Sequence, residues 1–371
     1  MNVVAERVRA AGAAGRPLRI RGAGTWLGAG RPVADGDSLS LMEHRGIVEY
    51  VPGDLTLTAL AGTPLRELQS ATRAHGQWLP LDPWGGDDGT IGATISTATA
   101  GPWSHANGLP RDVVLGMEFV NGSGSVVRSG GRVVKNVAGY DLTRLLTGSW
   151  GTLGVITEVT LRLRALPDRA VTLALTVPTS AGDLGSLALR LRALPFVPLG
   201  AELVNAALAN ELGIGTAPVL LCRVVGNAKS VQSQIELLRE LGRLESVPDT
   251  TWERLRTIES PTDATWRWSD SPDRFGTTWG AGEAIRDIDD LLMHGNPIRG
   301  IVRFIARGGL ESVTAEAARP AAAFAGTVMF ERMPANAWSL LPQTDARGTL
   351  ARSIRSKFDP RGILNRGILG A

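Results

Sequence analysis

Residues 135–156 read KNVAGYDLTRLLTGSWGTLGVI. The stretch contains four glycines but no His, Cys or Glu. It is too rich in glycine for an ordinary core strand, and it has too few acid or base groups to form a catalytic centre by itself. Because Gly151 and Gly154 bracket Thr152-Leu153, we interpret this segment as backbone that faces a flat or narrow ligand; a β-bulge is the alternative.

A second glycine-rich segment lies near the N-terminus, where residues 19–30 read RIRGAGTWLGAG. An expected strand runs into the turn Gly22-Ala23-Gly24-Thr25. Glycine permits the positive φ angles with which successive N–H groups converge on an anion. The spacing matches neither the G-x-G-x-x-G fingerprint nor a Walker G-K-[ST] sequence. Taken alone, this segment is equally typical of a plain turn.

The third segment, residues 80–108, reads PLDPWGGDDGTIGATISTATAGPWSHANG and is rich in Gly, Ser, Thr and Ala. Small side chains let a backbone approach a ligand closely. We expect a buried loop here, whose amide groups need partners that a bound pyrophosphate would supply. Together the three segments predict a dinucleotide that lies along an extended crevice and is held mainly by backbone.

The composition limits the classes of protein that remain. Cys222 is the only cysteine, which excludes an internal disulfide and an all-cysteine iron–sulfur site within the chain and favours a cytoplasmic location. The net charge is +3, and the basic residues alternate with acidic ones, so nucleic acid is not an expected partner. The N-terminus lacks the layout of a signal peptide, and no apolar run is long enough to predict a transmembrane segment.

The 371 residues predict more than one domain and an α+β fold. We assign residues 1–166 to a first domain, 167–350 to a second α+β domain with a mainly antiparallel sheet, and 351–371 to a C-terminal segment. The first domain is expected to begin with a short amphipathic helix that leads into a strand. It should also contain a helix over 63–76 with Thr63 as N-cap, a hairpin over 113–130 and a half-buried strand that starts at 155.

With these residues in hand, the chain resembles the PCMH-type, or vanillyl-alcohol-oxidase-type, FAD-binding family, and within it the FAD-binding subunit of bacterial glycolate oxidases. The resemblance rests on RGAGT at 21–25, GTIGATISTATAGP at 89–102, the long motif from 111 to 159, and the tail FDPRGILNRG at 358–367. It is faint over 168–350. It implies a discontinuous, two-lobed fold in which a cap domain follows the FAD domain and the C-terminal segment returns to the flavin.

The resemblance and the glycine segments together predict the residues that contact the cofactor. They are Arg21, Gly22, Ala23, Gly24, Thr25, Trp26, Pro83, Gly89, Thr90, Gly92, Ala93, Ser96, Gly101, Lys135, Gly151, Gly154, Ile156 and Asn365. Where relatives often carry a His that bonds covalently to the flavin, this chain has Thr25 and Trp26. We therefore expect non-covalent FAD, and we expect Gly92→Trp to block its binding.

Two departures from the family pattern shape the functional prediction. Catalytic 2-hydroxy-acid dehydrogenases of the family carry an H-x-G-D-G-N-x-H metal motif; the nearest string here, LLMHGNPIRG, has only His294, so no metal site is expected. Their G-S-E-G reads Gly148-Ser149-Trp150-Gly151. The resemblance therefore implies an FAD-binding subunit of a glycolate or other 2-hydroxy-acid oxidase complex, with an electron-relay or supporting role.

The implied partners are a second flavoprotein subunit and an iron–sulfur subunit. Any membrane association is expected to occur through a partner. A small hydroxy acid is a further candidate ligand. Two alternatives stay open: a stand-alone FAD-dependent oxidase of another small alcohol or hydroxy acid, and a flavin-free structural subunit. No catalytic base is identified. Weak candidates are Lys135, His105 and Tyr140. Lys135 either stabilises reduced flavin or pairs with Asp141 to fix its loop.

Overall fold

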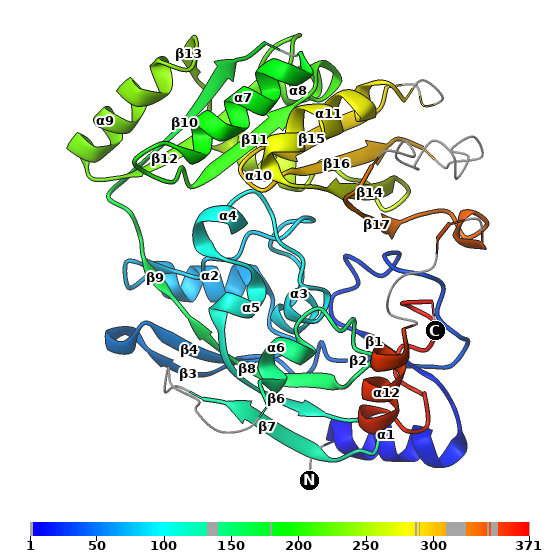
Figure 1. Ribbon diagram of the computed structural model, residues 1–371. Coiled ribbons are helices and arrows are strands. Elements are labelled where there is room, and N and C mark those ends of the chain that lie inside the picture. Colours follow the sequence, from blue (N-terminus) through cyan, green and yellow to red (C-terminus); the bar gives the residue numbers. More distant parts are fainter. Residues whose placement is uncertain are drawn as a thin grey trace. The chain divides into compact units, whose positions relative to one another are not determined.

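The computed structural model describes residues 3–131, 140–178, 180–285, 288, 290–308, 324–339, 341–342 and 348–370. It divides into two compact units (Figure 1). Unit 1 comprises Met1–Gly101, Gly108–Leu166 and Pro342–Ala371, and unit 2 comprises Pro102–Asn107 and Pro167–Leu341. The C-terminal segment thus belongs to the unit that the N-terminal half builds. The expected boundaries differ at two places, because Pro102–Asn107 groups with unit 2 and residues 342–350 group with unit 1.

A five-stranded antiparallel sheet forms the centre of unit 1. Its order is β3-β4-β8-β6-β7. The strands are β3 (Ile47–Val51), β4 (Thr56–Leu60), β8 (Val155–Arg162), β6 (Val114–Val120) and β7 (Val126–Gly130). The expected hairpin over 113–130 is confirmed as β6 and β7. Strand β8 is central and mostly buried, because it pairs with a neighbour on each side.

The N-terminal segment and the C-terminal tail meet at one small parallel sheet. Helix α1 (Val3–Ala14) buries an apolar stripe and leads into β1 (Leu18–Arg21), as expected. Strand β1 pairs in parallel with β2 (Asp37–Ser40). The tail bridges to the same strand, since the amide of Leu18 donates to the carbonyl of Ile363 at 2.7 Å. The last residues are therefore fixed beside the first glycine segment.

Short helices connect these strands. They are α2 (Leu65–Arg73), α3 (Ile91–Thr97), α5 (Pro110–Val113), α6 (Leu142–Leu146) and α12 (Thr349–Phe358), with a small β5 (Gln77–Trp78) and β9 (Arg164–Ala165) pair. The N-cap of α2 is Pro64, so the expectation that Thr63 caps this helix is wrong. The hydroxyl of Thr63 instead donates to the carbonyl of Leu60 at 2.7 Å.

Unit 2 contains an eight-stranded sheet in which every pairing is antiparallel, which confirms the expected sheet type. In spatial order the strands are β13 (Leu244–Ser246), β10 (Arg169–Thr176), β12 (Val219–Gly226), β11 (Gly200–Val204), β15 (Leu292–Asn296), β16 (Ile301–Ala306), β14 (Ala264–Ser269) and β17 (Thr327–Arg332).

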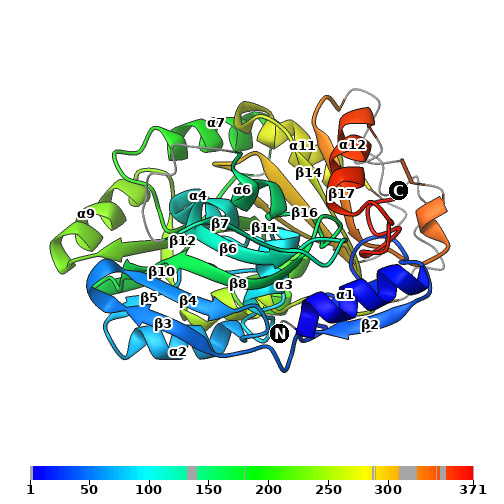
Figure 2. The same ribbon diagram turned by 90° about the horizontal axis from the view of Figure 1, so that it is seen from below.

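Helices cover one face of this sheet. Helices α7 (Ala181–Arg192) and α11 (Phe275–Glu283) lie side by side along it, and α9 (Ala228–Arg239) packs on β10 and β12 (Figure 2). Their apolar side chains form a core with alternate strand residues such as Leu173, Cys222 and Trp266. Helices α8 (Ala206–Leu212) and α10 (Thr250–Arg256) complete the unit. Buried Cys222 is thus part of the core.

The other face of the sheet presents polar residues, because side chains alternate between the two faces of a strand. Glu202, Asn296 and Arg303 lie on it and are all buried. The short helix α4 (Ser104–Asn107) packs here: Trp103 lies under the guanidinium groups of Arg223 and Arg256. The six residues Pro102–Asn107, which interrupt the sequence of unit 1, therefore form part of the polar face of this sheet.

Candidate functional site

One hollow in unit 1 brings together residues from the three glycine segments and from the tail. It holds about 740 Å³ of space between protein atoms, part of it open to solvent. Thirteen of the predicted cofactor contacts line it: Arg21, Gly22, Gly24, Thr25, Trp26, Thr90, Gly92, Ala93, Ser96, Gly151, Gly154, Ile156 and Asn365.

The first wall is the turn that follows β1. Gly24 has a φ of +83°, and a Cβ added there would meet no atom within 4 Å. The backbone of Gly24 therefore faces open space, as a cradle for a ligand requires. Gly22 differs, since a Cβ there would lie 2.1 Å from Oγ1 of Thr90. Glycine at 22 lets the first and second segments pack directly against each other.

The second wall is helix α3, in a segment where the sequence predicts a loop. Ala93, Ser96 and Thr97 lie on one face of this helix, at spacings of three and four residues, and line the hollow. The expectation that buried amides here need a pyrophosphate is wrong for Ile91 and Gly92, whose N–H groups donate to Thr63 and Ala61. Small side chains, rather than unpaired amides, form this wall.

Gly92 requires a corrected explanation. It lines the hollow, but a Cβ at this position would lie 2.6 Å from Cβ of Ala61 and 2.9 Å from its carbonyl oxygen. Glycine is needed here because α3 packs closely on the residue that follows β4. The substitution Gly92→Trp would therefore damage the packing of unit 1 before it tested cofactor binding, and a neighbouring position gives a cleaner test.

The third wall comes from the stretch before β8 and from the tail. Trp150 adopts a φ of +54° and Asn365 a φ of +41°, both in the left-handed region. The side chain of Asn365 accepts from the amide of Ile20 at 2.8 Å and donates to the carbonyl of Trp150 at 2.8 Å. One buried amide side chain thus joins β1, the segment at 148–151 and the tail at the edge of the hollow.

This arrangement predicts a large effect of Asn365→Ala. The substitution leaves a buried N–H and a buried carbonyl without partners, so the free energy of unfolding should fall by about 2–4 kcal/mol. The affinity for FAD should fall with it, because β1, the segment at 148–151 and the tail lose their common contact at the edge of the hollow. Urea denaturation and flavin titration measure the two effects. The exposed Asn210→Ala is the control, and an equally small change in both variants would contradict this role.

The remaining predicted contacts lie elsewhere. Ala23, Pro83, Gly89 and Gly101 do not line the hollow. Gly101 packs against the carbonyl oxygen of Asp82, where a Cβ would come within 1.9 Å. Lys135 falls outside the part of the chain that the structure describes, so its predicted flavin contact stays a prediction. The structure therefore does not support a role in cofactor binding for Ala23, Pro83, Gly89 or Gly101.

Sequence reasoning missed several residues of the lining. Of these, Arg19 and Ile20 belong to β1, and Thr97 completes the small face of α3. The strand period could have found Arg19, since it shares a face with Arg21. Trp150 also lines the hollow. The sequence marks it as a departure from relatives but does not indicate a pocket residue, because a bulky side chain is uncommon in the left-handed region.

The weak catalytic candidates do not meet in this hollow. Tyr140 is 92% exposed, and Asp141 caps α6 by accepting from the amide of Arg144 at 3.0 Å. His105 belongs to unit 2, where Nε2 lies 2.7 Å from the carbonyl oxygen of Pro198 and Nδ1 lies 3.1 Å from Nδ2 of Asn296. These contacts tie His105 to the polar face of the second sheet.

His105 belongs to a buried polar cluster of unit 2. Asn296 donates to Glu202 at 3.3 Å, and Glu202 lies 3.1 Å from Nδ1 of His294. Burial raises the pKa of Glu202 to about 8, lowers that of His294 to about 3 and lowers that of His105 to about 4. At neutral pH this cluster is therefore largely uncharged, and it holds a proton on a buried carboxyl group.

The raised pKa of Glu202 predicts a dependence of stability on pH. Between pH 4.5 and about 8 the folded state binds more protons at Glu202 than the unfolded state does, so the free energy of unfolding falls as pH rises. The lowered pKa values of His294 and His105 make the free energy of unfolding rise with pH, but only below the usual histidine pKa of 6.5. From pH 6.5 to 8, Glu202 should therefore lower stability by about 1–2 kcal/mol.

Glu202→Gln should remove this decline, whereas the exposed Glu236→Gln on α9 should keep it. Chemical denaturation at a series of pH values measures the difference. Equal slopes in the two variants between pH 6.5 and 8 would show that Glu202 does not titrate as its burial requires.

Two features are absent from the described residues. In the ranges given above, no group of three or more His, Cys, Asp or Glu side chains is placed to hold a metal ion. Within the same ranges, no helix has both the length and the apolar character needed to cross a membrane.

Comparisons with known proteins agree with this fold and with an FAD-binding domain. A family model described as an FAD binding domain matches residues 2–130. Glycolate oxidase subunit GlcE of Escherichia coli (strain K12) is 36% identical over 251 residues, which are 67% of this chain and 70% of that protein. Glycolate oxidase subunit GlcD of Bacillus subtilis (strain 168) is 37% identical over 158 residues, or 42% of this chain and 34% of that protein.

A probable mitochondrial D-lactate dehydrogenase of Danio rerio is 31% identical over 64% of this chain and 49% of its own length. The chain thus spans about a third to a half of the GlcD and D-lactate dehydrogenase relatives. Among solved structures, 4-ethylphenol oxidase from Gulosibacter chungangensis superposes with a TM-score of 0.77 at 17% identity, covering 99% of this chain and 87% of that one. An alkyldihydroxyacetonephosphate synthase superposes with a TM-score of 0.70 at 17% identity, over 98% and 73% of the two chains.

Fold, glycine segments and relatives together define a flavoprotein class. The chain belongs to the PCMH-type, or vanillyl-alcohol-oxidase-type, FAD-binding oxidoreductase family, and its cofactor is FAD. The hollow in unit 1 fits that group, because Gly24 leaves open space at a backbone turn and α3 presents only small side chains opposite. When bound, the flavin supplies the redox chemistry by accepting electrons as a hydride or singly.

Proposed function

We propose that this chain is the FAD-binding subunit of an oxidase or dehydrogenase complex that acts on glycolate or a similar 2-hydroxy acid, and that it relays electrons or supports a second flavoprotein. The observation that carries the proposal is the chemistry of the hollow. Among the residues that the structure describes, which exclude Lys135, its lining includes no His, Asp, Glu, Cys, Lys or Tyr, and its ionisable groups are Arg19 and Arg21. Such a lining can hold a cofactor but offers no base for the O–H proton of an alcohol.

The residues of unit 1 would hold FAD in distinct ways. Gly22–Trp26 would approach the pyrophosphate with backbone, and Arg21 adds a positive charge beside that turn. The small face of α3 would let the cofactor lie flat against the helix. Binding would be non-covalent, since Thr25 and Trp26 offer no nucleophile for a bond to the flavin. The predicted contacts that do not line the hollow are not part of this assignment.

The proposed partners follow from what the chain cannot supply. A single buried cysteine cannot ligate an iron–sulfur cluster, so an electron path through such a cluster requires another chain. GlcE and GlcD, which are similar to this chain, are both glycolate oxidase subunits by name. A second flavoprotein and an iron–sulfur subunit are therefore the partners we propose, in the cytoplasm and with any membrane contact made through them. Affinity purification and cell fractionation test this part.

One observation favours the alternative of a stand-alone oxidase. Glu202 and His294 form a buried acid–base pair in unit 2, with an Nδ1 to Oε2 distance of 3.1 Å. Both side chains are almost fully buried, at 3% and 1% exposure, so a substrate would not reach them without rearrangement. The geometry therefore supports the subunit more than the independent enzyme, and nothing in the hollow supports a flavin-free structural role.

Anaerobic reduction of the isolated, FAD-loaded chain with a panel of 2-hydroxy acids tests the proposal. Dithionite should bleach the flavin, whereas glycolate and D-lactate should leave its absorbance unchanged over the time of a turnover assay. Addition of the second flavoprotein should then permit reduction. Rapid bleaching of the chain by one hydroxy acid alone would contradict the subunit proposal and establish the stand-alone enzyme.

A further inference from the structure

A second hollow in unit 1 lies on the C-terminal segment. It holds about 860 Å³ of space between protein atoms, part of it open to solvent. Four arginines line it: Arg352 and Arg355 from α12, and Arg361 and Arg366 from the turns that follow. Asp359 is its one carboxylate.

The carboxylate of Asp359 already has a hydrogen-bond partner within unit 1. Asp359 is 3% exposed, and its Oδ2 accepts from the amide of Leu364 at 2.8 Å. Its side chain packs against Gly122, where a Cβ would lie 2.3 Å from Oδ1. Asp359 therefore fixes the turn after α12, and burial raises its pKa. It neutralises at most one of the four positive charges.

Among the described residues, three arginines of the hollow lack the carboxylate partners that some other arginines of unit 1 have. Arg16 pairs with Asp37 at 2.8 Å, and Arg128 pairs with Glu118 at 2.9 Å. Within the described part of the chain, no carboxylate lies within 4.0 Å of Arg352, Arg361 or Arg366. Converging positive charges repel one another unless an anion joins them.

The framework behind these side chains is fixed. Arg352 and Arg355 are three residues apart and share one face of α12. The side chain of Arg361 packs on α1, where a Cβ at Gly12 would lie 3.0 Å from its guanidinium group. The tail is held to β1 through Leu364 and Asn365. The two sides of the hollow therefore keep their spacing without a ligand.

This hollow is distinct from the cofactor pocket. Asn365 is the one residue common to the two linings. Its side chain forms the partition, since both of its polar atoms are engaged with Ile20 and Trp150. A ligand on the arginine side would therefore not occupy the space assigned to FAD.

We propose that the arginine-lined hollow is a binding site for a small oxyanion that carries two or more phosphate or carboxylate groups. Guanidinium groups match both groups in geometry, because each presents a fork of N–H donors to paired oxygens. Four such forks from two chain segments suit a ligand with several charged groups rather than one. The site does not depend on the proposed complex.

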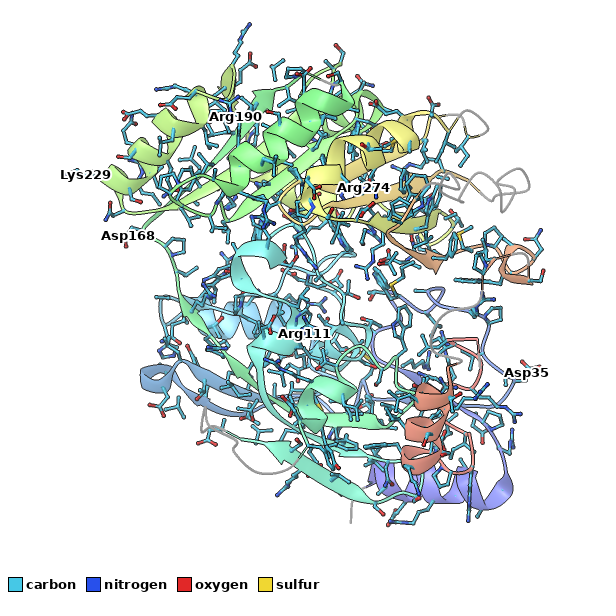
Figure 3. The ribbon with its side chains drawn as sticks, viewed as in Figure 1. Asp35, Arg111, Asp168, Arg190, Lys229 and Arg274 are labelled. Atoms are coloured by element: carbon cyan, nitrogen blue, oxygen red, sulfur yellow. The ribbon has the colours of Figure 1, made fainter. Side chains whose placement is uncertain are left out.

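Titration calorimetry of the FAD-loaded chain at low ionic strength tests the site, with pyrophosphate and citrate as probes. We expect saturable binding at one site per chain. Arg352→Gln/Arg366→Gln should weaken it by about tenfold or more. The control is Arg73→Gln/Arg111→Gln, which removes the same charge from exposed positions of unit 1. Arg111 lies on α5, away from the C-terminal segment in sequence, and is labelled in Figure 3.

Three results would overturn the proposal. They are the absence of saturable binding to the parent protein, an equal loss in the two double variants, and competition between the probe and FAD. The third would show that the hollow belongs to the cofactor site. Retained flavin absorbance and an unchanged melting temperature in each variant establish that it is folded. Preference for pyrophosphate or for citrate then identifies which acid group the site prefers.

Discussion

Ala93→Trp should yield a folded protein that retains no FAD. Ala93 lies on the face of α3 that lines the hollow and is only half-buried, so an indole there can extend into the space assigned to the cofactor. We expect the affinity for FAD to fall by about a hundredfold or more, because the ligand and the side chain cannot share that volume. The melting temperature of the flavin-free protein should change by only about 2 °C, as for other substitutions away from the core.

Flavin absorbance after gel filtration and a titration with FAD measure this effect. Ser70→Trp is the matched control, because it places the same side chain on an exposed position of α2 in the same unit. This variant should bind FAD as the parent protein does. Full flavin content in Ala93→Trp would show that the hollow is not the cofactor site.

The second large effect concerns stability. Arg303→Met should lower the free energy of unfolding by about 3–5 kcal/mol, because two buried carboxylates lose their nearest counter-charge and keep only the more distant Arg267 and Arg332. The guanidinium group of Arg303 contacts both Glu259 and Glu331, with its Nε at 2.9 Å from Glu331, and the side chains of all three are nearly inaccessible. Burial alone would lower the pKa of Arg303, but the two carboxylates raise it above its usual value.

Urea denaturation measures this loss, and a triple variant separates its cause. Arg303→Met with Glu259→Gln and Glu331→Gln removes all three charges, so it should recover a large part of the lost stability. The exposed Arg190→Gln on α7 is the control for loss of a surface charge. If Arg303→Met were no more destabilising than this control, the buried ion pairs would not support unit 2.

Periodicity in the sequence predicted those elements whose burial follows a simple pattern. The hairpin of β6 and β7 was recognisable because alternating residues flank the turn at 121–125. Helix α1 was recognisable by its apolar stripe, and the returning tail by its resemblance to relatives. In each case the local pattern and the tertiary contact require the same conformation, so no competing interaction displaces it.

Long-range contacts decided the elements that were missed. Four of the seven residues of helix α3 are Gly, Ser or Thr, which have low helix propensity, and its packing beside Ala61 stabilises it instead. The hydroxyl of Thr63 donates to the carbonyl of Leu60 and does not cap helix α2, which therefore begins one residue later than the sequence predicts. His105 contacts Pro198 and Asn296, which are remote in sequence, and no local pattern indicates such a partner.

Much of the candidate site was predictable because backbone approach requires glycine in a recognisable way. Gly24 and Gly151 have positive φ angles and line the hollow, as their segments predicted. The partition formed by Asn365 was not predictable in detail, since it joins residues from both ends of the chain. The arginine-lined hollow was also missed, because two arginines of α12 and two of the tail become neighbours only after the turn at Asp359 forms.

The flavin content of the purified chain after acid precipitation tests the central claim most directly. The account predicts a yellow protein with about one FAD per chain, all of which passes into the supernatant when the protein is precipitated. Flavin that stays with the precipitate would contradict non-covalent binding. A colourless chain that takes up no FAD on reconstitution would contradict the assignment of the hollow itself.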